Sequence, residues 1–386
     1  MMNGAAKKKI VVLVDWYLPG YKAGGPIQSV ANMVARLKND FEFAIITADT
    51  DQKETTPYPN VKSNEWNILP DGTRVYYFSK EERKFSTLKK LMLKEQADFF
   101  YLNSLFSVFF TMYPLIIRKN FLPSRKIILA CRGMLGKGAL DIKPIKKKIF
   151  IALARLTGLY RNITWHASTS VEAEEIRQVF GKRQKVLVAT NLAALKNNHP
   201  NDRIKTKGAA RFVYLSRIAP IKNLIATLDA INQVPDKYEV IFDIYGPADD
   251  AEYWEHCKNA IAKAPPHIII NYKGAVENAQ AKKILRQYHF YLLQTHHENF
   301  GHSIIEAMAA GCVPIIGDQT PWTNLSSVKA GWDIPVAYQA ELIHILKQCC
   351  EMEQDQFSEW SRGASSYAEH VINDPQLIED NRKLFA

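Results

Sequence analysis

Cysteine is scarce in this sequence, and its distribution argues against two kinds of architecture. The 386 residues include five cysteines, which are Cys131, Cys257, Cys312, Cys349 and Cys350. Their number is odd and no Cys-x-x-Cys pair occurs, so neither a disulfide framework nor a zinc knuckle is expected. We expect free thiols, most of them buried, because unpaired cysteine packs as a small apolar side chain.

Long apolar runs are missing as well. No stretch reaches the length of about 18 apolar residues that a membrane-spanning helix needs. The basic start, 1–9, is followed by a short apolar run, 10–14, which ends at Asp15. This run is too short for the apolar core of a secretory signal. We therefore expect the chain to stay in the cytoplasm.

The composition is that of a basic globular protein. Hydrophobic residues make up 47% of the sequence and charged residues 23%, and the length predicts two domains of about 150–200 residues each. The net charge of +11 indicates an anionic partner, which can be nucleic acid, an anionic membrane surface or a phosphorylated small molecule. No zinc-finger, helix-turn-helix or RNA-binding signature is present, so a nucleic-acid partner is not expected.

Short apolar runs alternate with amphipathic stretches, which indicates an α/β fold. Strands are predicted at 10–14, 43–47, 74–78, 99–102, 126–130, 163–166 and 185–188, and again at 211–215, 239–245, 268–272, 290–293 and 313–316. Helices are predicted at 27–37, 105–117, 147–156, 170–180, 223–231, 251–263, 279–287 and 302–310, with only helix after about residue 340. The helix at 170–180 is expected to begin with Ser170 as its cap.

A polar stretch between the two blocks has the composition of a linker. We therefore predict an N-terminal domain at 1–196, a C-terminal domain at 197–370, and a final segment, 371–386, that returns to the N-terminal domain. In open α/β sheets, ligands bind at the carboxyl ends of the strands. The functional residues are accordingly sought just after predicted strands.

A glycine pair follows the first predicted strand. Gly24 and Gly25 have no Cβ, so the backbone there can come close to a ligand, and the helix start behind them can attract a phosphate. The spacing is neither Gly-x-Gly-x-x-Gly nor that of a P-loop, so those two kinds of nucleotide site are not expected. A turn with a purely structural role accounts for the pair equally well.

Two cations follow the first strand of the second block. Arg217 stands just past the strand end, and Lys222 stands where the next helix is predicted to begin. An Arg side chain can hold a phosphate with two parallel hydrogen bonds, and a Lys side chain adds a point charge. A cation at the positive end of a helix is unfavourable, so we expect an anion nearby to offset it.

The most specific segment is 297–311. Glu298 is predicted in a loop after a strand, Gly301 in a tight turn, and Glu306 about one turn inside the following helix. Carboxylates at both ends suit the hydroxyls of a sugar nucleotide, and backbone amides between them suit its phosphate. The histidines of this segment lack the four-residue spacing of a helical metal pair, so no metal site is expected.

In this order, the segments resemble the GT-B glycosyltransferases, specifically glycosyltransferase family 4 and its members in bacterial surface-polysaccharide synthesis. The motifs are Ser-Arg-x-x-Pro-x-Lys-Asn at 216–223, Glu-Asn-Phe-Gly-x4-Glu-Ala-x-Ala-x-Gly at 298–311, and the Gly24–Gly25 pair. The resemblance covers nearly the whole chain. It implies two tandem Rossmann-like domains that face each other across a cleft, a nucleotide-sugar donor, and retention of anomeric configuration. It implies no metal and no cofactor, with a UDP-sugar favoured over a GDP-sugar.

The resemblance also implies residue roles. Glu306 would bind the ribose hydroxyls, Arg217 and Lys222 would stabilise the diphosphate leaving group, and Glu298 would hold the hydroxyls of the donor sugar. The catalytic residues implied are Glu298, Arg217 and Lys222. The donor-binding residues implied are Gly24, Gly25, Asn299, Phe300, Gly301, His302, Ser303 and Glu306.

The acceptor side departs from the family pattern. Related sequences have His-Gly-Met in a loop of the N-terminal domain, where this chain has Arg132-Gly-Met. We expect Asn103, Ser104 and Arg132 near the acceptor.

A basic run, 143–148, leads into an apolar stretch, 149–154, and such a stretch can lie on an anionic membrane. This favours a lipid-linked glycan acceptor, as in capsule, O-antigen or exopolysaccharide assembly, and a peripheral place at the inner face of the cytoplasmic membrane. An ordinary domain helix with a charged face fits the same pattern. The alternatives in function are a soluble transferase with a small-molecule acceptor and, from another class, a non-enzymatic nucleic-acid-binding protein.

Overall fold

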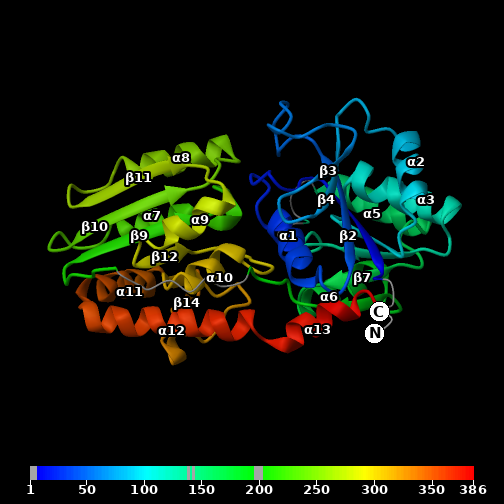
Figure 1. Ribbon diagram of the computed structural model, residues 1–386. Coiled ribbons are helices and arrows are strands. Elements are labelled where there is room, and N and C mark those ends of the chain that lie inside the picture. The colour runs from blue at the N-terminus through cyan, green and yellow to red at the C-terminus, as the bar shows by residue number, and fades with distance from the viewer. Residues whose placement is uncertain (1–6, 137–139, 141–143, 195–202) are drawn as a thin grey trace. The chain divides into compact units, whose positions relative to one another are not determined.

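The computed structural model of the protein describes residues 7–136, 140, 144–194 and 203–386 (Figure 1). The chain forms two compact units. The first contains Met1–Leu192 together with Pro375–Ala386, and the second contains Ala193–Asp374. Most of the predicted linker, 196–202, lies outside the described residues.

An eight-stranded sheet forms the centre of the first unit. Its strands are β1 (Lys9–Val14), β2 (Glu42–Ala48), β3 (Trp66–Ile68), β4 (Arg74–Phe78), β5 (Phe99–Asn103), β6 (Lys126–Ala130), β7 (Thr164–Ala167) and β8 (Lys185–Val188). Their order is β3-β4-β2-β1-β5-β6-β7-β8, and all neighbours pair in parallel except β3 and β4. Because side chains of a strand alternate between faces, Val11 and Leu13 enter one apolar core and Ile10, Val12 and Val14 enter the other.

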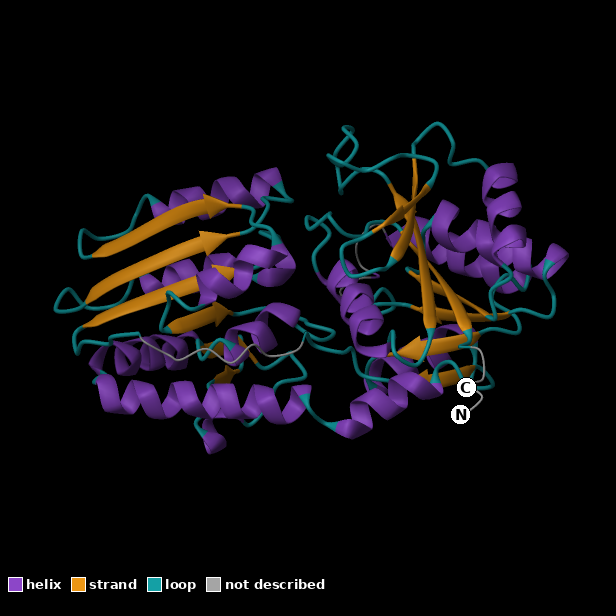
Figure 2. Ribbon diagram, in the orientation of Figure 1, coloured by secondary structure: helices purple, strands orange, loops and turns teal. Residues whose placement is uncertain are grey.

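Helices cover both faces of this sheet (Figure 2). They are α1 (Gly25–Leu37), α2 (Phe85–Glu95), α3 (Tyr113–Phe121), α5 (Pro144–Leu156), α6 (Ser170–Phe180) and α13 (Pro375–Lys383), with a π-helical turn, η1 (Val108–Met112), before α3. Helices on both faces explain why β1 is apolar from Ile10 to Val14, since a parallel strand in the middle of such a sheet is buried on both sides.

The last residues of the chain belong to the first unit. The Phe385 ring lies edge-on against Phe41 at 5.2 Å and against Phe99 at 5.7 Å between centroids. Arg382 of α13 forms an ion pair with Asp40 at 3.1 Å. Aromatic packing of this kind fixes α13 beside α1, which it contacts directly.

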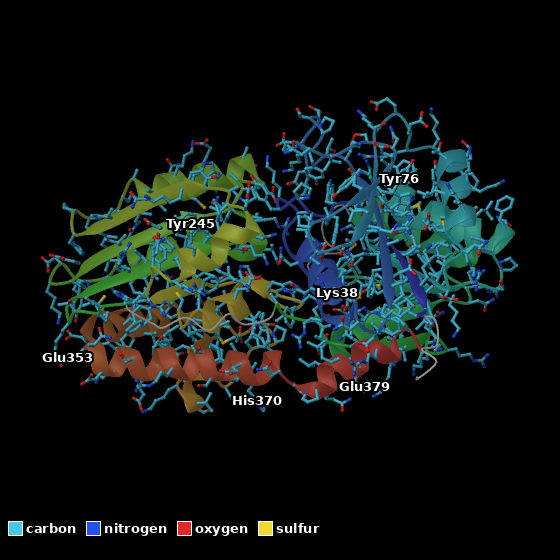
Figure 3. The ribbon with its side chains drawn as sticks, viewed as in Figure 1. Lys38, Tyr76, Tyr245, Glu353, His370 and Glu379 are labelled. Atoms are coloured by element: carbon cyan, nitrogen blue, oxygen red, sulfur yellow. The ribbon has the colours of Figure 1, made fainter. Side chains whose placement is uncertain are left out.

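A six-stranded sheet, parallel throughout, forms the centre of the second unit. Its strands are β9 (Ala209–Leu215), β10 (Glu239–Tyr245), β11 (Ile268–Gly274), β12 (Phe290–Leu293), β13 (Val313–Gly317) and β14 (Trp332–Ile334), in the order β11-β10-β9-β12-β13-β14. Its helices are α7 (Leu224–Ile231), α8 (Ala251–Ile261), α9 (Asn278–Leu285), α10 (His302–Ala309), α11 (Gln339–Glu351) and α12 (Gln354–Ile372), with 3-10 turns η2 (Pro220–Lys222) and η3 (Leu325–Val328). Figure 3 labels Tyr245 at the end of β10, and Glu353 and His370 near the two ends of α12.

The predicted strands are all present, with ends that differ by at most two residues. The expectation of free, buried cysteines is confirmed, since all five are unpaired and buried. Within the described part of the chain, no helix is long and apolar enough to cross a membrane.

Three local expectations are wrong. The helix predicted at 105–117 begins only at Val108, as a π-helical turn, because the Ser107 side chain caps it by accepting from the Phe110 amide. Thr169, not Ser170, caps α6: the Thr169 hydroxyl accepts from the Glu172 amide at 3.1 Å, which makes Ser170 the first helical residue. Lys222 lies in η2 rather than at the start of α7, because Asn223 adopts a left-handed conformation between them.

The loops that follow β9 and β10 meet at a glycine. Gly246 has φ of +143°, and an added Cβ would lie 1.8 Å from the carbonyl oxygen of Ser216. The Ser216 amide donates to the Tyr245 carbonyl at 3.1 Å, so the two loops are also joined by a backbone hydrogen bond. Only glycine fits this contact, which therefore fixes the loop that carries Arg217.

We predict that Gly246→Ala lowers the free energy of unfolding by about 2–5 kcal/mol, since left-handed strain and steric overlap add. The matched control is Gly208→Ala, where φ is +89° and no atom lies within 4 Å of the added Cβ. That variant should lose only the strain, about 1–2 kcal/mol. Urea unfolding followed by tryptophan fluorescence measures both, and equal losses would contradict the steric role of Gly246.

Candidate functional site

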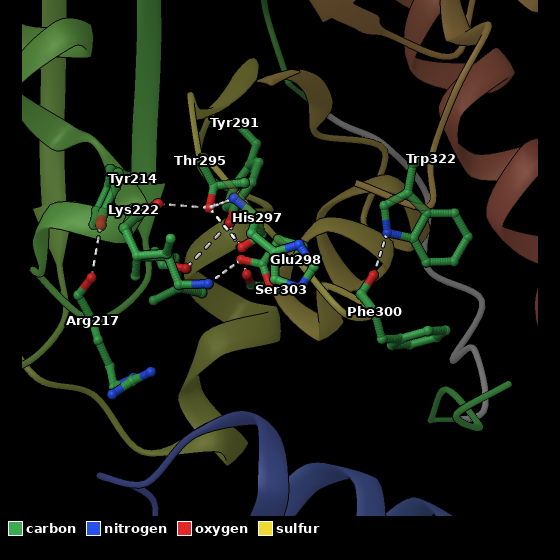
Figure 4. Close-up of polar contacts among 12 residues, drawn as sticks. Tyr214, Arg217, Lys222, Tyr291, Thr295, His297, Glu298, Phe300, Ser303 and Trp322 are labelled. Carbon is green, nitrogen blue, oxygen red and sulfur yellow. Dashed lines mark hydrogen bonds and ion pairs between the residues drawn. The ribbon is translucent and has the colours of Figure 1, made fainter. Parts of the chain in front are cut away.

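Residues singled out in the second unit follow two neighbouring strands of its sheet. Lys222 comes after β9 and Glu298 comes after β12, which are adjacent in the strand order. The carboxyl ends of parallel strands lie at one edge of a sheet, so the two loops emerge side by side. The Lys222 ammonium donates a hydrogen bond to Oε1 of Glu298, and the two side chains form an ion pair (Figure 4).

This ion pair is shielded from solvent and tied into the backbone. Only 11% of the Lys222 side chain and 12% of the Glu298 side chain are exposed. The Ile221 carbonyl accepts from the Thr295 hydroxyl at 3.0 Å and from the His296 amide at 2.9 Å, which joins the two loops. The anion expected beside Lys222 is therefore supplied by the protein itself, as Glu298.

Arg217 is placed separately from this pair. Its Nη1 lies 3.1 Å from Oδ2 of Asp249, a residue of the loop after β10, and 40% of the Arg217 side chain is exposed. The Tyr214 hydroxyl donates to the Arg217 carbonyl at 2.8 Å. Figure 4 shows the guanidinium directed away from Lys222 and Glu298. The structure thus brings Lys222 and Glu298 into contact but leaves Arg217 outside that contact.

A tight turn connects Glu298 to α10. Gly301 has φ of +78°, and an added Cβ would lie 2.7 Å from Cδ1 of Ile304, so the turn requires glycine. The preceding carbonyl, of Phe300, accepts from the Trp322 indole at 2.6 Å, and the two rings lie 5.2 Å apart (Figure 4). These contacts fix the point at which α10 begins, and the first backbone N–H groups of a helix find no partner within the helix.

The remaining donor-binding candidates surround this turn. Asn299 is half-buried between Glu298 and Phe300, and His302 is the first residue of α10. The Ser303 hydroxyl lies 2.7 Å from the Tyr291 hydroxyl, which donates to the Leu215 carbonyl at 3.2 Å. The Ser303 side chain therefore connects α10 to β9 and β12.

Glu306 lies on α10 and is half-buried. Burial raises the pKa of its carboxyl to about 7, and Lys282 of α9 opposes this shift only in part. Among the described residues, no hydrogen bond to the Glu306 carboxylate is made. A carboxylate with its lone pairs available in a sheltered place is suited to accept hydrogen bonds from ligand hydroxyls.

In the first unit, the glycine pair lies where the helix α1 begins. Gly24 has φ of +65° and precedes the first helical residue, Gly25, and no atom lies within 4 Å of a Cβ added at either position. The Asp51 carboxylate accepts from the amides of Tyr21 at 2.9 Å and Lys22 at 3.1 Å, which holds the loop. The backbone at the pair is therefore open to approach.

The three acceptor-side candidates lie together in the first unit. Asn103 ends β5, Arg132 follows β6, and Nε of Arg132 donates to Oδ1 of Asn103 at 2.5 Å. The Ser104 hydroxyl lies 3.7 Å from the sulfur of Met134, two residues after Arg132. β5 and β6 are adjacent strands, which explains this grouping.

Sequence reasoning missed several partners of these residues. Asp249 follows β10 and Thr295 follows β12, and the only signal in the sequence is a polar residue just after a predicted strand. Asn191 and Tyr101 contact Arg132, and His166 contacts Tyr101; the separation of these residues along the chain hides the grouping. Within the described ranges, no group of three or more His, Cys, Asp or Glu side chains is placed to hold a metal ion.

The comparison with known proteins connects this site to a family. Residues 196–325, which include Arg217, Lys222, Glu298 and Glu306, match the family of glycosyl transferases group 1. The solved sucrose-phosphate synthase from Thermosynechococcus elongatus has a TM-score of 0.72 and 13% identity, with 98% of each chain covered. The solved structure of Anabaena HepE in complex with UDP and glucose has a TM-score of 0.70 and 14% identity, again over 98% of each chain.

The chain has the two-domain GT-B fold. The predicted fold class, an α/β protein of two domains, is confirmed by these matches. A curated relative is the GDP-mannose:cellobiosyl-diphosphopolyprenol α-mannosyltransferase of Xanthomonas campestris, which is 24% identical over 151 residues. The aligned part is 37% of this chain and 39% of that relative, so the chain matches well under half of its length.

We predict that Lys222 and Glu298 depend on each other for stability. Lys222→Met alone leaves a sheltered carboxylate without its cation and should cost about 3 kcal/mol of the free energy of unfolding. The double variant, Lys222→Met with Glu298→Leu, should lose less than the sum of the two single changes, because neither charge is then left unpaired. Urea unfolding of the unsubstituted chain, the two single variants and the double variant gives the coupling free energy between Lys222 and Glu298. Additive losses would show that the ion pair contributes nothing to the fold.

Proposed function

We propose that this chain is a retaining, metal-independent glycosyltransferase of family 4. In this proposal it transfers a sugar from a UDP- or GDP-sugar to a hydroxyl of a lipid-linked glycan, during assembly of a bacterial surface polysaccharide. The observation that carries the proposal is the set formed by Lys222, Glu298 and Glu306. All three belong to the matched segment, 196–325, and lie on loops or a helix at the carboxyl edge of the second sheet.

The chemistry of this set fits a nucleotide-sugar donor. Transfer of the sugar leaves negative charge on a diphosphate, and cations and helix starts can stabilise such charge without a metal ion. Lys222 is paired with Glu298, which lies three residues before Gly301, so one cation is joined to the loop that leads into α10. Glu306 offers a carboxylate to ribose hydroxyls, and Glu298 offers one to the sugar.

The lipid-linked acceptor is supported by a relative and by a surface. The name of the Xanthomonas relative gives cellobiosyl-diphosphopolyprenol as its acceptor, which is a lipid-linked glycan. In this chain, α5 exposes an apolar stripe: Ile145 is 72% exposed, Ile149 56%, Leu153 55% and Leu156 85%. Their spacing of four, four and three residues places these side chains on one face of the helix.

Cations flank the stripe. Lys146 lies on one side of it, and Lys148 and Arg155 lie on the other, all three exposed, while Ala154 of the same helix is buried against the core. Lys143 of the predicted basic run lies outside the described residues. An apolar face flanked by cations is the arrangement with which helices lie in the interface of an anionic bilayer. This supports a membrane surface as the place where the acceptor is met.

We predict that one nucleotide family raises the melting temperature of the protein, while the other nucleotides do not. A screen of UDP, GDP and ADP measures this at pH 8, which lies above the raised Glu306 pKa of about 7. A ligand at a hundred times its dissociation constant stabilises the folded state by about 2.7 kcal/mol. Glu306→Ala and Lys222→Ala should each weaken binding by more than about tenfold, equivalent to about 1.4 kcal/mol.

The controls for this screen are Glu239→Ala and Lys263→Ala. Both residues are exposed, and Glu239 begins β10, so it lies at the opposite edge of the sheet from the proposed site. Neither change should alter nucleotide affinity. Unchanged affinity in both Glu306→Ala and Lys222→Ala would remove the proposed placement of the donor, and no shift with any nucleotide would refute the donor class.

We predict that the protein floats with anionic vesicles in a density gradient at low salt, and that Ile149→Ser with Leu153→Ser reduces the bound fraction at least about tenfold. Burial of an exposed Leu or Ile contributes about 1.5–3 kcal/mol. The matched control is Ile68→Ser with Val171→Ser, which removes apolar side chains of comparable exposure, 75% and 65%, from β3 and α6. A role for α5 would be contradicted if both double variants lost vesicle binding, or if both floated equally well.

A further inference from the structure

Arg132 is held in a fixed position by three neutral side chains. Its Nε donates to Oδ1 of Asn103 at 2.5 Å, its Nη1 donates to Oδ1 of Asn191, and its Nη2 donates to the Tyr101 hydroxyl at 2.9 Å. These partners come from β5 and from the segment after β8, whereas Arg132 follows β6. The Arg132 backbone is itself left-handed, with φ of +55°, so both its backbone and its side chain are constrained.

A second layer fixes the partners of Arg132. The Nε2 atom of His166 lies 2.7 Å from the Ala189 carbonyl, which can only accept, so Nε2 carries the proton and Nδ1 is an acceptor. The Tyr101 hydroxyl, 2.7 Å from Nδ1, therefore donates to His166 and accepts from Arg132. Burial lowers the pKa of His166 to about 3, so this ring stays neutral and adds no charge beside the guanidinium.

The charge of Arg132 has no counterion in the described part of the chain. No described carboxylate lies within ion-pairing distance of its guanidinium. Glu172, the carboxylate that approaches the same loop, is occupied by the Gly133 amide at 2.6 Å and by the Ser168 amide at 2.7 Å. A half-buried cation with only neutral partners leaves its charge available to a ligand.

Hydrogen-bond donors are also in excess here. A guanidinium has five N–H groups, and Arg132 uses three of them within the described residues. Asn103 is 2% exposed, and its Nδ2 has no hydrogen-bond partner in the described structure, although its Oδ1 accepts from Arg132. A buried donor without an acceptor is rare in folded proteins and calls for an explanation. A ligand whose oxygens accept hydrogen bonds from these donors would provide that explanation.

We infer that Arg132 and Asn103 form an oxyanion-binding subsite at the carboxyl ends of β5 and β6. Its ligand is an anionic group of the acceptor, with two oxygens that a guanidinium can hold in parallel hydrogen bonds. Such a group is either the phosphoryl group of a lipid-linked glycan or the carboxylate of an acidic sugar. The acceptor role rests on the proposed transferase function, but the binding of an oxyanion does not. Tyr101, Asn191 and His166 are positioning residues in this assignment.

The test titrates inorganic pyrophosphate and D-glucuronate separately into full-length protein at low ionic strength, followed by calorimetry. Pyrophosphate is also expected at the proposed donor site, so all proteins carry Lys222→Ala. The decisive variant adds Arg132→Gln, and a second adds Arg132→Lys, which keeps the charge but loses the two-pronged hydrogen bonding. The matched control adds Arg183→Gln, which removes the same charge from an exposed position of the first unit.

We expect at least tenfold weaker binding of one probe with Arg132→Gln, an intermediate loss with Arg132→Lys, and no change with Arg183→Gln. Weaker pyrophosphate binding identifies a phosphoryl ligand, and weaker glucuronate binding identifies an acidic sugar. Equal affinity in all variants, or no binding of either probe, overturns the subsite.

A second readout keeps the inference testable if Arg132→Gln does not fold. In protein labelled with 15N-arginine, the Arg132 Nε–H resonance, identified by its loss in Arg132→Lys, should shift when the effective probe is added. A static resonance contradicts the subsite. The thermal shift with nucleotide is measured in parallel on the unsubstituted chain, which keeps both Lys222 and Arg132. A normal nucleotide shift there, with no oxyanion binding by the Lys222→Ala protein, refutes only the subsite. Oxyanion binding by the Lys222→Ala protein, with no nucleotide shift in the unsubstituted chain, refutes only the donor site.

Discussion

Parallel pairing of the strands is the constraint on which both groups of candidate residues depend. A parallel strand must be followed by a connection that crosses back over the sheet, so every carboxyl end opens at the same edge. In the second unit this brings the loops after β9, β10 and β12 together, and in the first unit it brings together those after β5, β6 and β8. The candidate site residues follow the strands, and burial of the apolar residues within the strands holds the sheet, and with it these loops, in place.

The two groups handle positive charge differently. In the second unit Lys222 is neutralised by Glu298, and both side chains are sheltered from solvent. A cation that is already paired can stabilise a new anion only if its existing partner moves or is itself satisfied by the ligand. A sugar hydroxyl that donates to Glu298 while a phosphate approaches Lys222 would meet both needs at once. Under the proposed function, the ion pair would therefore do more than stabilise the fold, because it would keep each charge in position until a ligand with both kinds of group binds.

Much of this could be predicted from the sequence, and the failures have a physical cause. Twelve of the fourteen described strands were predictable because buried parallel strands are short apolar runs, whereas β3 and β14 were missed because each has only three residues. Gly301 was predictable because a turn must precede α10. The anion beside Lys222 was expected, but its identity was not, since Glu298 is 76 residues further along the chain. The side chains of Thr169 and Ser170 can both cap a helix, and only the backbone conformation shows that Thr169 is the cap of α6.

The network around Arg132 shows the limit most clearly. Tyr101 is 31 residues away from Arg132 in the sequence and Asn191 is 59 residues away, and neither carries a signal of its own. What Tyr101 and Asn191 share becomes visible only in the fold. Both accept hydrogen bonds from the guanidinium without carrying a negative charge that would neutralise it. A carboxylate in any of these positions would hold Arg132 more strongly and would also cancel its charge. Neutral acceptors fix the orientation of the Arg132 guanidinium and leave its positive charge uncompensated, which suits the binding of an anion. The presence of asparagine and tyrosine at these positions, in place of aspartate or glutamate, therefore supports the inference that a ligand binds at this edge of the first sheet.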